Sequence, residues 1–398
     1  MSHELFSLNK DLARLREEGF HIEIRGSLLV MNSVPYVDSS RKVRTGSLVS
    51  TLNLAGNLTQ PPETHVIYWD GEHPCKSDGT KMSEISHQSL TQNLGHGVTV
   101  HHSFSSKPPE GYADYYLKMS TYASILAGPA STLNPGLSPR IFPSVDDSFG
   151  GGPFNYLDTA SDRVGIGHLT SQLENEVISL IGVGGTGSYI LDLIAKTPVR
   201  EIRLFDDDEF LQHNAFRAPG APLLEALRHA PKKVDYLHGI YSRMHRGIVP
   251  KAVKVTEANI NMLDGTTFAF ICIDAGDAKH AIVRKLELLD VPFIDVGMGL
   301  ELIGGSLGGI LRVTTSTPEC RSHFHSGRVS FEGGGEKDLY ASNIQVADLN
   351  ALNACLAVLK WKKLRGFYRD LDHELHCTYT TDGNLLLNDK GDENAAAA

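Results

Sequence analysis

The stretch that decides the fold is Val177-Ile178-Ser179-Leu180-Ile181-Gly182-Val183-Gly184-Gly185-Thr186-Gly187-Ser188. Its first five residues are apolar apart from one serine, which is typical of a strand buried on both faces of a sheet. The G-x-G-x-x-G pattern follows directly, and a helix is expected over residues 188–196. At such a turn the glycines let backbone N–H groups approach a phosphate chain, and the helix N-terminus adds partial positive charge. The stretch therefore predicts a nucleotide-binding turn, with a tight turn that binds no ligand as the alternative.

Strands and helices alternate along the chain after this turn. Strands are expected over residues 201–205, 251–255, 268–273 and 292–296, and helices over 233–246, 278–289 and 347–364. Several of the strands are apolar on both faces, which predicts a parallel sheet covered by helices on both sides. The predicted fold class is α/β, with a doubly wound, Rossmann-like, mostly parallel sheet.

A different pattern precedes the glycine-rich run Gly150-Gly151-Gly152-Pro153. Helices are expected over residues 1–20 and 113–127, and strands over 21–25, 27–31, 64–69 and 98–104. Gly and Pro at this density mark a linker or a long loop. We therefore expect a smaller α+β domain over residues 1–150 and the sheet domain over residues 151–390.

Composition restricts the class of protein. The chain has 398 residues, of which 41% are hydrophobic and 21% charged, as is ordinary for a soluble protein of two domains. No run approaches the ~18 apolar residues of a membrane-spanning helix, and residues 1–20 lack the apolar segment of a signal peptide. A formal charge of −10 disfavours nucleic-acid binding, and five cysteines fit a reducing compartment. We expect a cytoplasmic protein without a nucleic-acid or membrane partner.

A second informative stretch, Asp206-Asp207-Asp208, ends the strand that follows the glycine turn. An acid at this place in a doubly wound sheet binds a ribose. The further acids, with Asn214, Arg217 and Lys233 downstream, suit a nucleoside triphosphate with Mg²⁺, because carboxylates hold the metal and cations neutralise phosphate. The alternatives are a solvated acidic turn and a surface lysine.

Carboxylates also close a later strand, in Ile273-Asp274-Ala275-Gly276-Asp277. A carboxylate at the carboxyl end of a parallel strand points into the ligand crevice. Asp277 could equally cap the helix that follows, and the two roles are compatible.

The order of these residues resembles the ThiF/MoeB/E1 superfamily over about residues 153–365. The residues that carry the resemblance are Gly182, Gly184, Gly185, Gly187, Asp206, Asp208, Asn214, Arg217, Lys233, Asp274 and Asp277. Such enzymes adenylate the C-terminal glycine carboxylate of ubiquitin-like or sulfur-carrier proteins. The whole chain is similar to the bacterial subgroup in which a domain of unknown function precedes a ThiF-like domain.

The resemblance implies a role for each matching side chain. Asp206 would bind the ribose, and Asn214 and Asp277 would lie at the triphosphate and Mg²⁺. Arg217 and Lys233 would neutralise phosphate charge.

The resemblance also implies partners for the chain. A partner subunit often contributes an arginine to the site of such enzymes, and Arg163 lies in the corresponding region, so a homodimer is expected. ATP and Mg²⁺ are the expected cofactors. The expected protein partners are a small ubiquitin-like or sulfur-carrier protein ending in glycine and an E2-like acceptor.

The chain departs from the family pattern in two respects. Ala278 stands where an asparagine is usual, and the two Cys-x-x-Cys pairs that hold structural zinc in many members are missing. We therefore expect no such zinc site.

Acyl transfer beyond adenylation requires a thiolate. Cys320 is the candidate, because Arg321, His323 and His325 follow it and could lower its pKa. An inert loop cysteine is the alternative. Among the other cysteines, Cys272 and Cys355 are expected in the core, Cys377 is undecided, and Cys75 ranks after Cys377 as an acyl acceptor.

A second cluster of histidines and a cysteine lies in the N-terminal domain. It comprises His65, His73, Cys75, His87, His96, His101 and His102. Their spacing matches no standard zinc pattern, so a structural or partner-binding role without metal is expected, with a metal or thiol site as the alternative.

The sequence predicts an E1-like adenylyltransferase that uses ATP and Mg²⁺. Thioester transfer to Cys320 is the expected second step. An NAD(P)- or FAD-dependent oxidoreductase would also use the glycine turn and Asp206, and a nucleotide-binding adaptor without catalysis would use all of the nucleotide site. Both stay open as alternatives.

Overall fold

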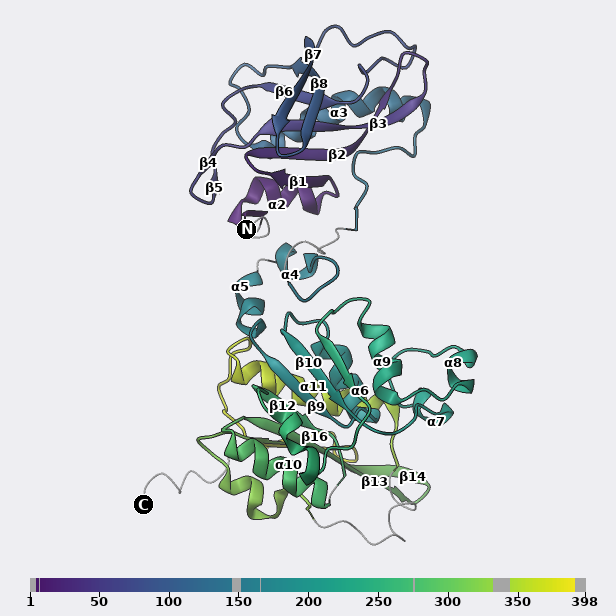
Figure 1. Cartoon of the computed structure of the whole chain (residues 1–398), viewed down its shortest axis with the longest axis vertical. Helices are drawn as coiled ribbons and strands as arrows, with labels where there is room; N and C mark the ends of the chain where they lie inside the picture. Colours follow the sequence, from purple (N-terminus) through teal and green to yellow (C-terminus); the bar gives the residue numbers. More distant parts are fainter. Residues whose placement is uncertain are drawn as a thin grey trace. The chain divides into compact units, whose positions relative to one another are not determined.

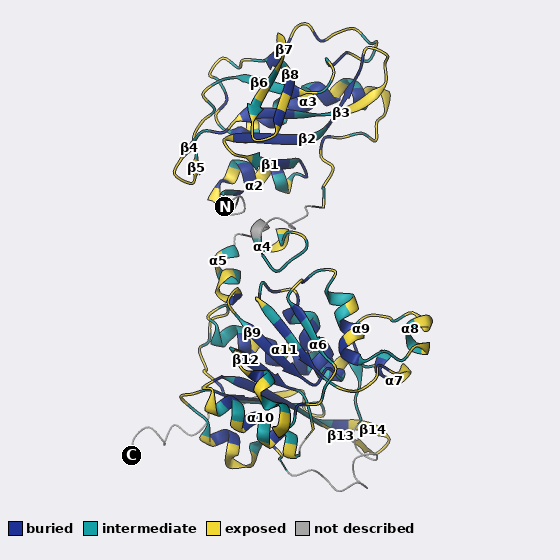
Figure 2. Ribbon diagram, in the orientation of Figure 1, coloured by how far each residue is buried: buried dark blue, intermediate teal, exposed yellow. Residues whose placement is uncertain are grey.

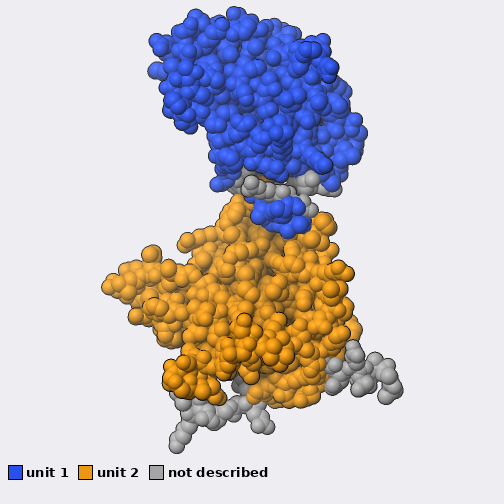
Figure 3. Space-filling view, turned by 180° about the vertical axis from the view of Figure 1, so that it is seen from behind, with its two compact units in different colours: residues 1–145, 158–167 blue, residues 146–157, 168–398 orange. Residues whose placement is uncertain are grey.

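The structure of the chain is a computed structural model that describes residues 5–390 except residues 7, 145–151, 165, 275 and 332–343, and except the side chains of residues 162 and 163. The chain forms two compact units, residues 1–145 with 158–167 and residues 146–157 with 168–398 (Figure 3). Each unit is built around a hydrophobic core of its own. No helix in the described residues is both long and apolar enough to cross a membrane.

The first unit contains a six-stranded antiparallel sheet in the order β1-β2-β3-β6-β8-β7 (Figure 1). Its strands are β1 His21–Arg25, β2 Leu28–Val37, β3 Val43–Thr51, β6 Val66–Asp70, β7 Ser86–Gly95 and β8 Val98–Ser105, with β4 Leu54–Ala55 and β5 Leu58–Thr59 as a separate pair. Its helices include α2 Lys10–Glu17, α3 Tyr115–Leu133 and α4 Thr159–Arg163. Met119, Tyr122 and Leu126 recur at helical spacing along α3 and bury that face against the sheet.

The second unit contains an eight-stranded sheet in the order β11-β10-β9-β12-β13-β14-β15-β16. The strands are β9 Val177–Ile181, β10 Glu201–Phe205, β11 Ile248–Lys251, β12 Phe268–Ile271, β13 Phe293–Ile303, β14 Ser306–Ser316, β15 His376–Thr380 and β16 Leu385–Asp389. The first five strands in this order are parallel to one another, and the last three join on as antiparallel neighbours. Figure 2 shows the central strands β9 and β12 in the colour of buried residues.

Helices cover both faces of this sheet. The helical elements of this part of the chain are α5 Gly167–Thr170, η1 Ser171–Leu173, α6 Gly185–Ile194, α7 Gln212–Ala215, α8 Leu224–Arg228, α9 Lys233–Tyr241, η2 Glu257–Leu263, α10 Asp277–Leu288, η3 Phe324–Arg328 and α11 Ala347–Leu364. Apolar residues of α6, α9 and α11 share one core with the sheet, and those of η2, α10 and η3 share the core on its other face. The doubly wound fold that the sequence predicts is therefore confirmed.

The structure corrects several details of the prediction. The strand expected over residues 251–255 is β11, which ends at Lys251 and includes Pro250; an edge strand tolerates a proline because its outer N–H groups need no partner. The helix expected over 233–246 ends at Tyr241. Cys355 is exposed, because the buried stripe of α11 runs through Ala354 and Val358 and leaves Cys355 on the outer face.

Candidate functional site

The glycine turn joins β9 to α6 at the carboxyl edge of the sheet. Gly182 has a φ of +87°, and a Cβ atom there would lie 2.5 Å from the carbonyl oxygen of Cys272. A Cβ atom on Gly187 would overlap the carbonyl oxygen of Gly182. Both positions therefore require glycine, and the turn brings the start of α6 directly over the end of β9. The N-terminal N–H groups of α6 provide an anion-binding surface there.

Asp206 lies at the end of the neighbouring strand β10, with its side chain 9% exposed. Its carboxylate accepts hydrogen bonds from the backbone N–H groups of Val183 (2.9 Å) and Asp208 (3.0 Å). Burial nevertheless raises the pKa of Asp206, although the ammonium group of Lys233 opposes this effect from 3.8 Å away. Asp206 is thus a carboxylate whose charge the protein alone does not fully stabilise.

Lys233 begins α9 and links two of the acids. Its Nζ donates to Oδ2 of Asp208 at 2.6 Å, and this contact lowers the pKa of Asp208. The lysine side chain is 8% exposed, whereas the Asp208 side chain is 68% exposed. An exposed partner holds a lysine weakly, so Lys233 can exchange Asp208 for a phosphate at small cost.

Arg217 follows α7 and lines the same cleft. Its Nε is buried, and none of the described residues accepts a hydrogen bond from it. A buried guanidinium donor without an acceptor carries a desolvation cost that an anionic ligand would remove.

Asp277 begins α10, next to Gly276 with its φ of +140°, and its side chain is exposed in the cleft. No described residue forms an ion pair or hydrogen bond with its carboxylate. The three acids Asp206, Asp207 and Asp208 also lie close enough together to hold a cation. Oxygen donors of this kind suit Mg²⁺.

These groups line one cleft of about 790 Å³ at the carboxyl ends of the parallel strands. Of the residues predicted from sequence, the cleft contains Gly182, Gly184, Gly185, Asp206, Asp208, Arg217, Lys233, Asp274 and Asp277. It therefore combines a glycine turn, acids at the ends of two strands and three cationic side chains, of which Arg217 and Lys233 were predicted.

Comparison with known families gives two matches that together cover most of the chain. Residues 162–364, just over half of the chain, match the ThiF family. The chain belongs to the ThiF family. Residues 10–159 match a domain of unknown function, DUF6791, so the predicted resemblance is confirmed in both parts. Membership of the ThiF family supports an adenylating enzyme of the E1-like type.

Solved structures give weaker similarities. E. coli MccB with ATP is 14% identical over 58% of this chain and 69% of that chain, with a TM-score of 0.43. PaaA is 15% identical over 56% of this chain and 75% of that chain, with a TM-score of 0.40. No functional conclusion follows from similarities this low. No curated protein matches the chain.

The ThiF-family cleft also includes residues that sequence reasoning missed. They are Thr186, Lys254, Thr256, Glu257, Met298 and Asn353. Lys254, Thr256 and Glu257 follow β11, and correct placement of that strand would have put them at the carboxyl edge. Asn353 shares the buried face of α11 with Asn350, and two asparagines three residues apart on an apolar face were a usable signal.

Two residues predicted for the nucleotide site, Gly187 and Asn214, are not among the described residues that line the cleft. Gly187 packs beneath the turn. Asn214 is buried, and its Oδ1 accepts from the backbone N–H of Leu211 at 2.8 Å, which caps α7. The side chain of Arg163, in α4, lies outside the described residues.

Cys320 lies at the opposite edge of the sheet from the cleft. It follows β14, which runs antiparallel to β13 and pairs its last residue, Ser316, with Phe293, the first residue of β13. The neighbouring Arg321 donates to the Glu287 carbonyl near the end of α10 at 2.8 Å. Because α10 begins at Asp277 and contains 12 residues, its length separates the two places by about 17 Å.

Three polar side chains that follow Cys320, those of Arg321, His323 and His325, were expected near its thiol, and the structure brings His323 into contact with it. His323 approaches the thiol, with Nδ1 3.5 Å from Sγ, while its Nε2 donates to the Thr315 carbonyl at 2.7 Å. Arg321 pairs with Asp290, and His325 pairs with Glu287. The structure thus forms one Cys–His contact and directs the other two side chains to α10 and the turn after it.

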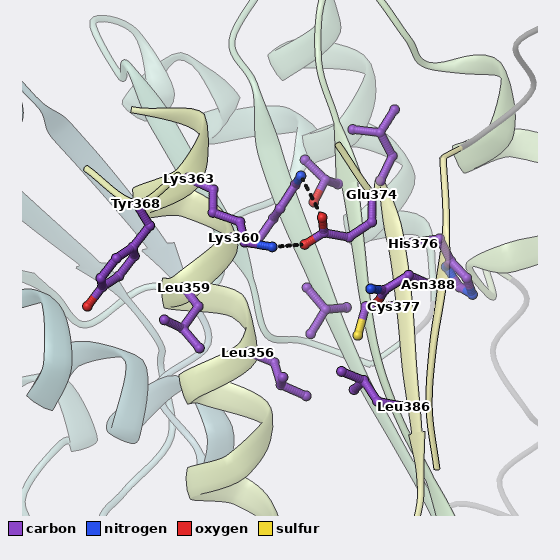
Figure 4. A pocket seen from close by; sticks show the side chains of 13 residues that line it. Leu356, Leu359, Lys360, Lys363, Tyr368, Glu374, His376, Cys377, Leu386 and Asn388 are labelled. Carbon is purple, nitrogen blue, oxygen red and sulfur yellow. Dashed lines mark hydrogen bonds and ion pairs between the residues drawn. The ribbon is translucent and has the colours of Figure 1, made fainter. Parts of the chain in front are cut away.

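Three of the other cysteines lie where burial raises the pKa of the thiol. Cys377 lines a separate hollow of about 180 Å³ between α11 and β15, where burial raises its thiol pKa to about 11 (Figure 4). Cys272 lies just past the end of β12 rather than within the strand as expected, and burial raises its pKa as well. Cys75 is fully buried in the first unit, which also raises its thiol pKa.

The histidines of the first unit make separate polar contacts. His73 contacts Ser86, His87 contacts Ser103, His101 contacts Thr91, and His102 contacts Ser89. In the described part of the chain, the acids at 206–208 are the single group whose arrangement could hold a metal ion.

Proposed function

We propose that the second unit is an E1-like adenylyltransferase. The observation that carries the proposal is the incomplete pairing of Asp206, Arg217 and Asp277 around the glycine turn. These groups together match the ribose, phosphate and metal parts of ATP with Mg²⁺. Asp277 would hold the ion at the triphosphate, where the ion would neutralise charge on the leaving pyrophosphate.

The reaction that we infer from the placement of these groups is adenylation of a carboxylate. A carboxylate oxygen of the substrate attacks the α-phosphorus, the bond from that phosphorus to the bridging oxygen breaks, and pyrophosphate leaves with the bond electrons. The product is an acyl adenylate. Arg217 and Lys233 stabilise the added negative charge, and the glycine turn aligns the phosphate chain, so the residues act through position and charge.

The proposed substrate is the C-terminal glycine carboxylate of a small ubiquitin-like or sulfur-carrier protein. A homodimer in which Arg163 reaches the partner's phosphates and an E2-like acceptor are further parts of the proposal. The proposed chemistry of this chain ends at the acyl adenylate, from which the acceptor would take the acyl group with AMP leaving, because Cys320 lies about one length of α10 from the cleft.

The proposal is tested by ATP–pyrophosphate exchange. The probes are recombinant ubiquitin-like proteins and sulfur-carrier proteins that end in a C-terminal glycine. We expect exchange with one of them, and none after its terminal glycine is removed. If the chain binds ATP but catalyses no exchange with any of these folded probes, the proposed enzymatic activity is wrong and the chain is a nucleotide-binding adaptor.

A further inference from the structure

Helix α11 borders the cleft from a part of the chain far from the nucleotide motifs. It packs against α6, the helix that begins at the glycine turn. Its Asn350 and Asn353 are both fully buried, and they lie on the stripe that faces the core. A buried amide is costly unless its polar atoms are hydrogen-bonded, so the partners of these side chains indicate why they are polar.

Asn350 joins two walls of the cleft. Its Oδ1 accepts a hydrogen bond from Oγ1 of Thr186 in the first turn of α6, at 3.0 Å. Its Nδ2 donates to the backbone carbonyl of Arg217, at 3.3 Å. These two bonds fix which end of the amide is oxygen and which is nitrogen.

Gly185 shows how closely Asn350 approaches the turn. A Cβ atom on Gly185 would overlap the amide group of Asn350. The glycine therefore serves close packing against α11 as well as the approach of phosphate to the backbone. The amide thus holds the start of α6 and the backbone of Arg217 at a set separation.

We propose that Asn350 is a positioning residue for the polyphosphate of the nucleotide. The inference rests on the proposed function. Asn350 touches no nucleotide atom itself; it sets the distance between the N–H groups of the glycine turn and the guanidinium of Arg217. Both groups would face phosphate, whereas the ribose acid Asp206 directly follows β10 and has no bond to Asn350 among the described residues.

Val358 provides a packing control. It lies on the same buried face of α11 as Asn350, in the core that α11 shares with α6, and it is not among the residues that line the cleft. Loss of its side chain costs packing of α11 without breaking a hydrogen bond to the glycine turn or to Arg217.

The test compares the affinities for Mg²⁺-ATP and for adenosine by calorimetry on the full chain. In Asn350→Ala we expect about tenfold weaker binding of ATP, equivalent to about 1.4 kcal/mol, and unchanged binding of adenosine. In Val358→Ala we expect the ratio of the two affinities to stay at the wild-type value. A purely structural role would weaken both ligands equally in both variants.

Thr186→Val tests the same contact if Asn350→Ala does not fold, because it removes one donor and keeps the helix. It should lower ATP affinity several-fold and leave adenosine affinity unchanged. If the folded Asn350→Ala and Thr186→Val variants keep the wild-type ratio of ATP affinity to adenosine affinity, the inference about Asn350 is wrong and the proposed function is unaffected. Absence of any ATP preference over adenosine in the wild-type chain overturns the proposed function instead.

Discussion

Two buried carboxylates of the second unit differ in how completely the protein pairs them. Asp295 on β13 is inaccessible to solvent and lies between two cations, with Lys279 at 2.7 Å and Arg312 bonded to its other oxygen. Asp206 on β10 is also largely buried, but its single cation, Lys233, is 3.8 Å away and bonds more closely to Asp208. Burial consequently raises the pKa of Asp206.

The difference distinguishes a structural acid from a binding acid. A buried carboxylate with two close cations is compensated within the folded protein, without any ligand. Removal of either the carboxylate or a cation leaves an uncompensated buried charge. A carboxylate that burial disfavours and the protein only partly compensates gains most from a ligand with hydroxyl donors, such as a ribose.

The largest expected effect concerns a third acid, Asp277, which is exposed and has no partner among the described residues. Asp277→Ala should lower the rate of ATP–pyrophosphate exchange by about 100-fold or more, because the site loses the carboxylate that would hold Mg²⁺ at the reacting phosphates. The melting temperature should stay near that of the wild type. Near-wild-type exchange in this variant would show that Asp277 is not part of the mechanism.

The next effect concerns stability at Asp295. Asp295→Asn should lower the free energy of unfolding by about 3–5 kcal/mol, because Lys279 and Arg312 lose their shared counter-charge. Chemical denaturation measures it. A change below about 1 kcal/mol would mean that the two acids do not differ as described.

Asp206→Asn should raise the free energy of unfolding, whereas Asp295→Asn lowers it, and it should also weaken the binding of ATP. ATP should bind about tenfold more weakly, because one charged hydrogen-bond acceptor for the ribose is lost. The ligand-free variant should melt at a higher temperature than the wild type, because the variant no longer buries a charge that the folded state disfavours.

The stability gain of Asp206→Asn should depend on pH. The raised pKa means that the folded state holds the proton more tightly than the unfolded chain, so the free energy of unfolding falls as pH rises above about 3.9. The variant's advantage should therefore grow from about pH 4 to the raised pKa and then stay constant. An advantage that is the same below and above this range would have another cause.

The smallest expected effect is at Cys320, at the other edge of the sheet. Cys320→Ala should leave exchange unchanged, because the adenylation groups lie about 17 Å away along α10. Non-reducing gels of the wild-type chain with its carrier then test whether a thiol-sensitive adduct forms at all. An adduct that disappears in Cys320→Ala would show that the Cys320 segment moves to the cleft.

Local patterns made much of the fold predictable. Strand 177–181 and helix 347–364 have the bounds that the sequence predicts, since apolar runs and helical periodicity are local signals. The glycine turn and Asp206 were predictable for the same reason, because each directly follows a strand.

The remaining features depend on contacts between distant segments. Asn350 lies 164 residues from Thr186 and 133 from Arg217, so no local pattern shows that it joins them. The place of Cys320 depends on β14 running antiparallel to β13, which returns the chain to the amino edge of the sheet. Asn214 has the family spacing, but its short helix uses the side chain as a cap.

Calorimetric titration of the wild-type chain with Mg²⁺-ATP, followed by NAD⁺, tests the central claim most directly, because both nucleotides would use the glycine turn and Asp206. We predict that ATP binds at one site per chain, that Arg217→Ala weakens it, and that NAD⁺ in excess does not displace it. Binding of NAD⁺ in preference to ATP, unaffected by Arg217→Ala, would contradict the account and favour an oxidoreductase.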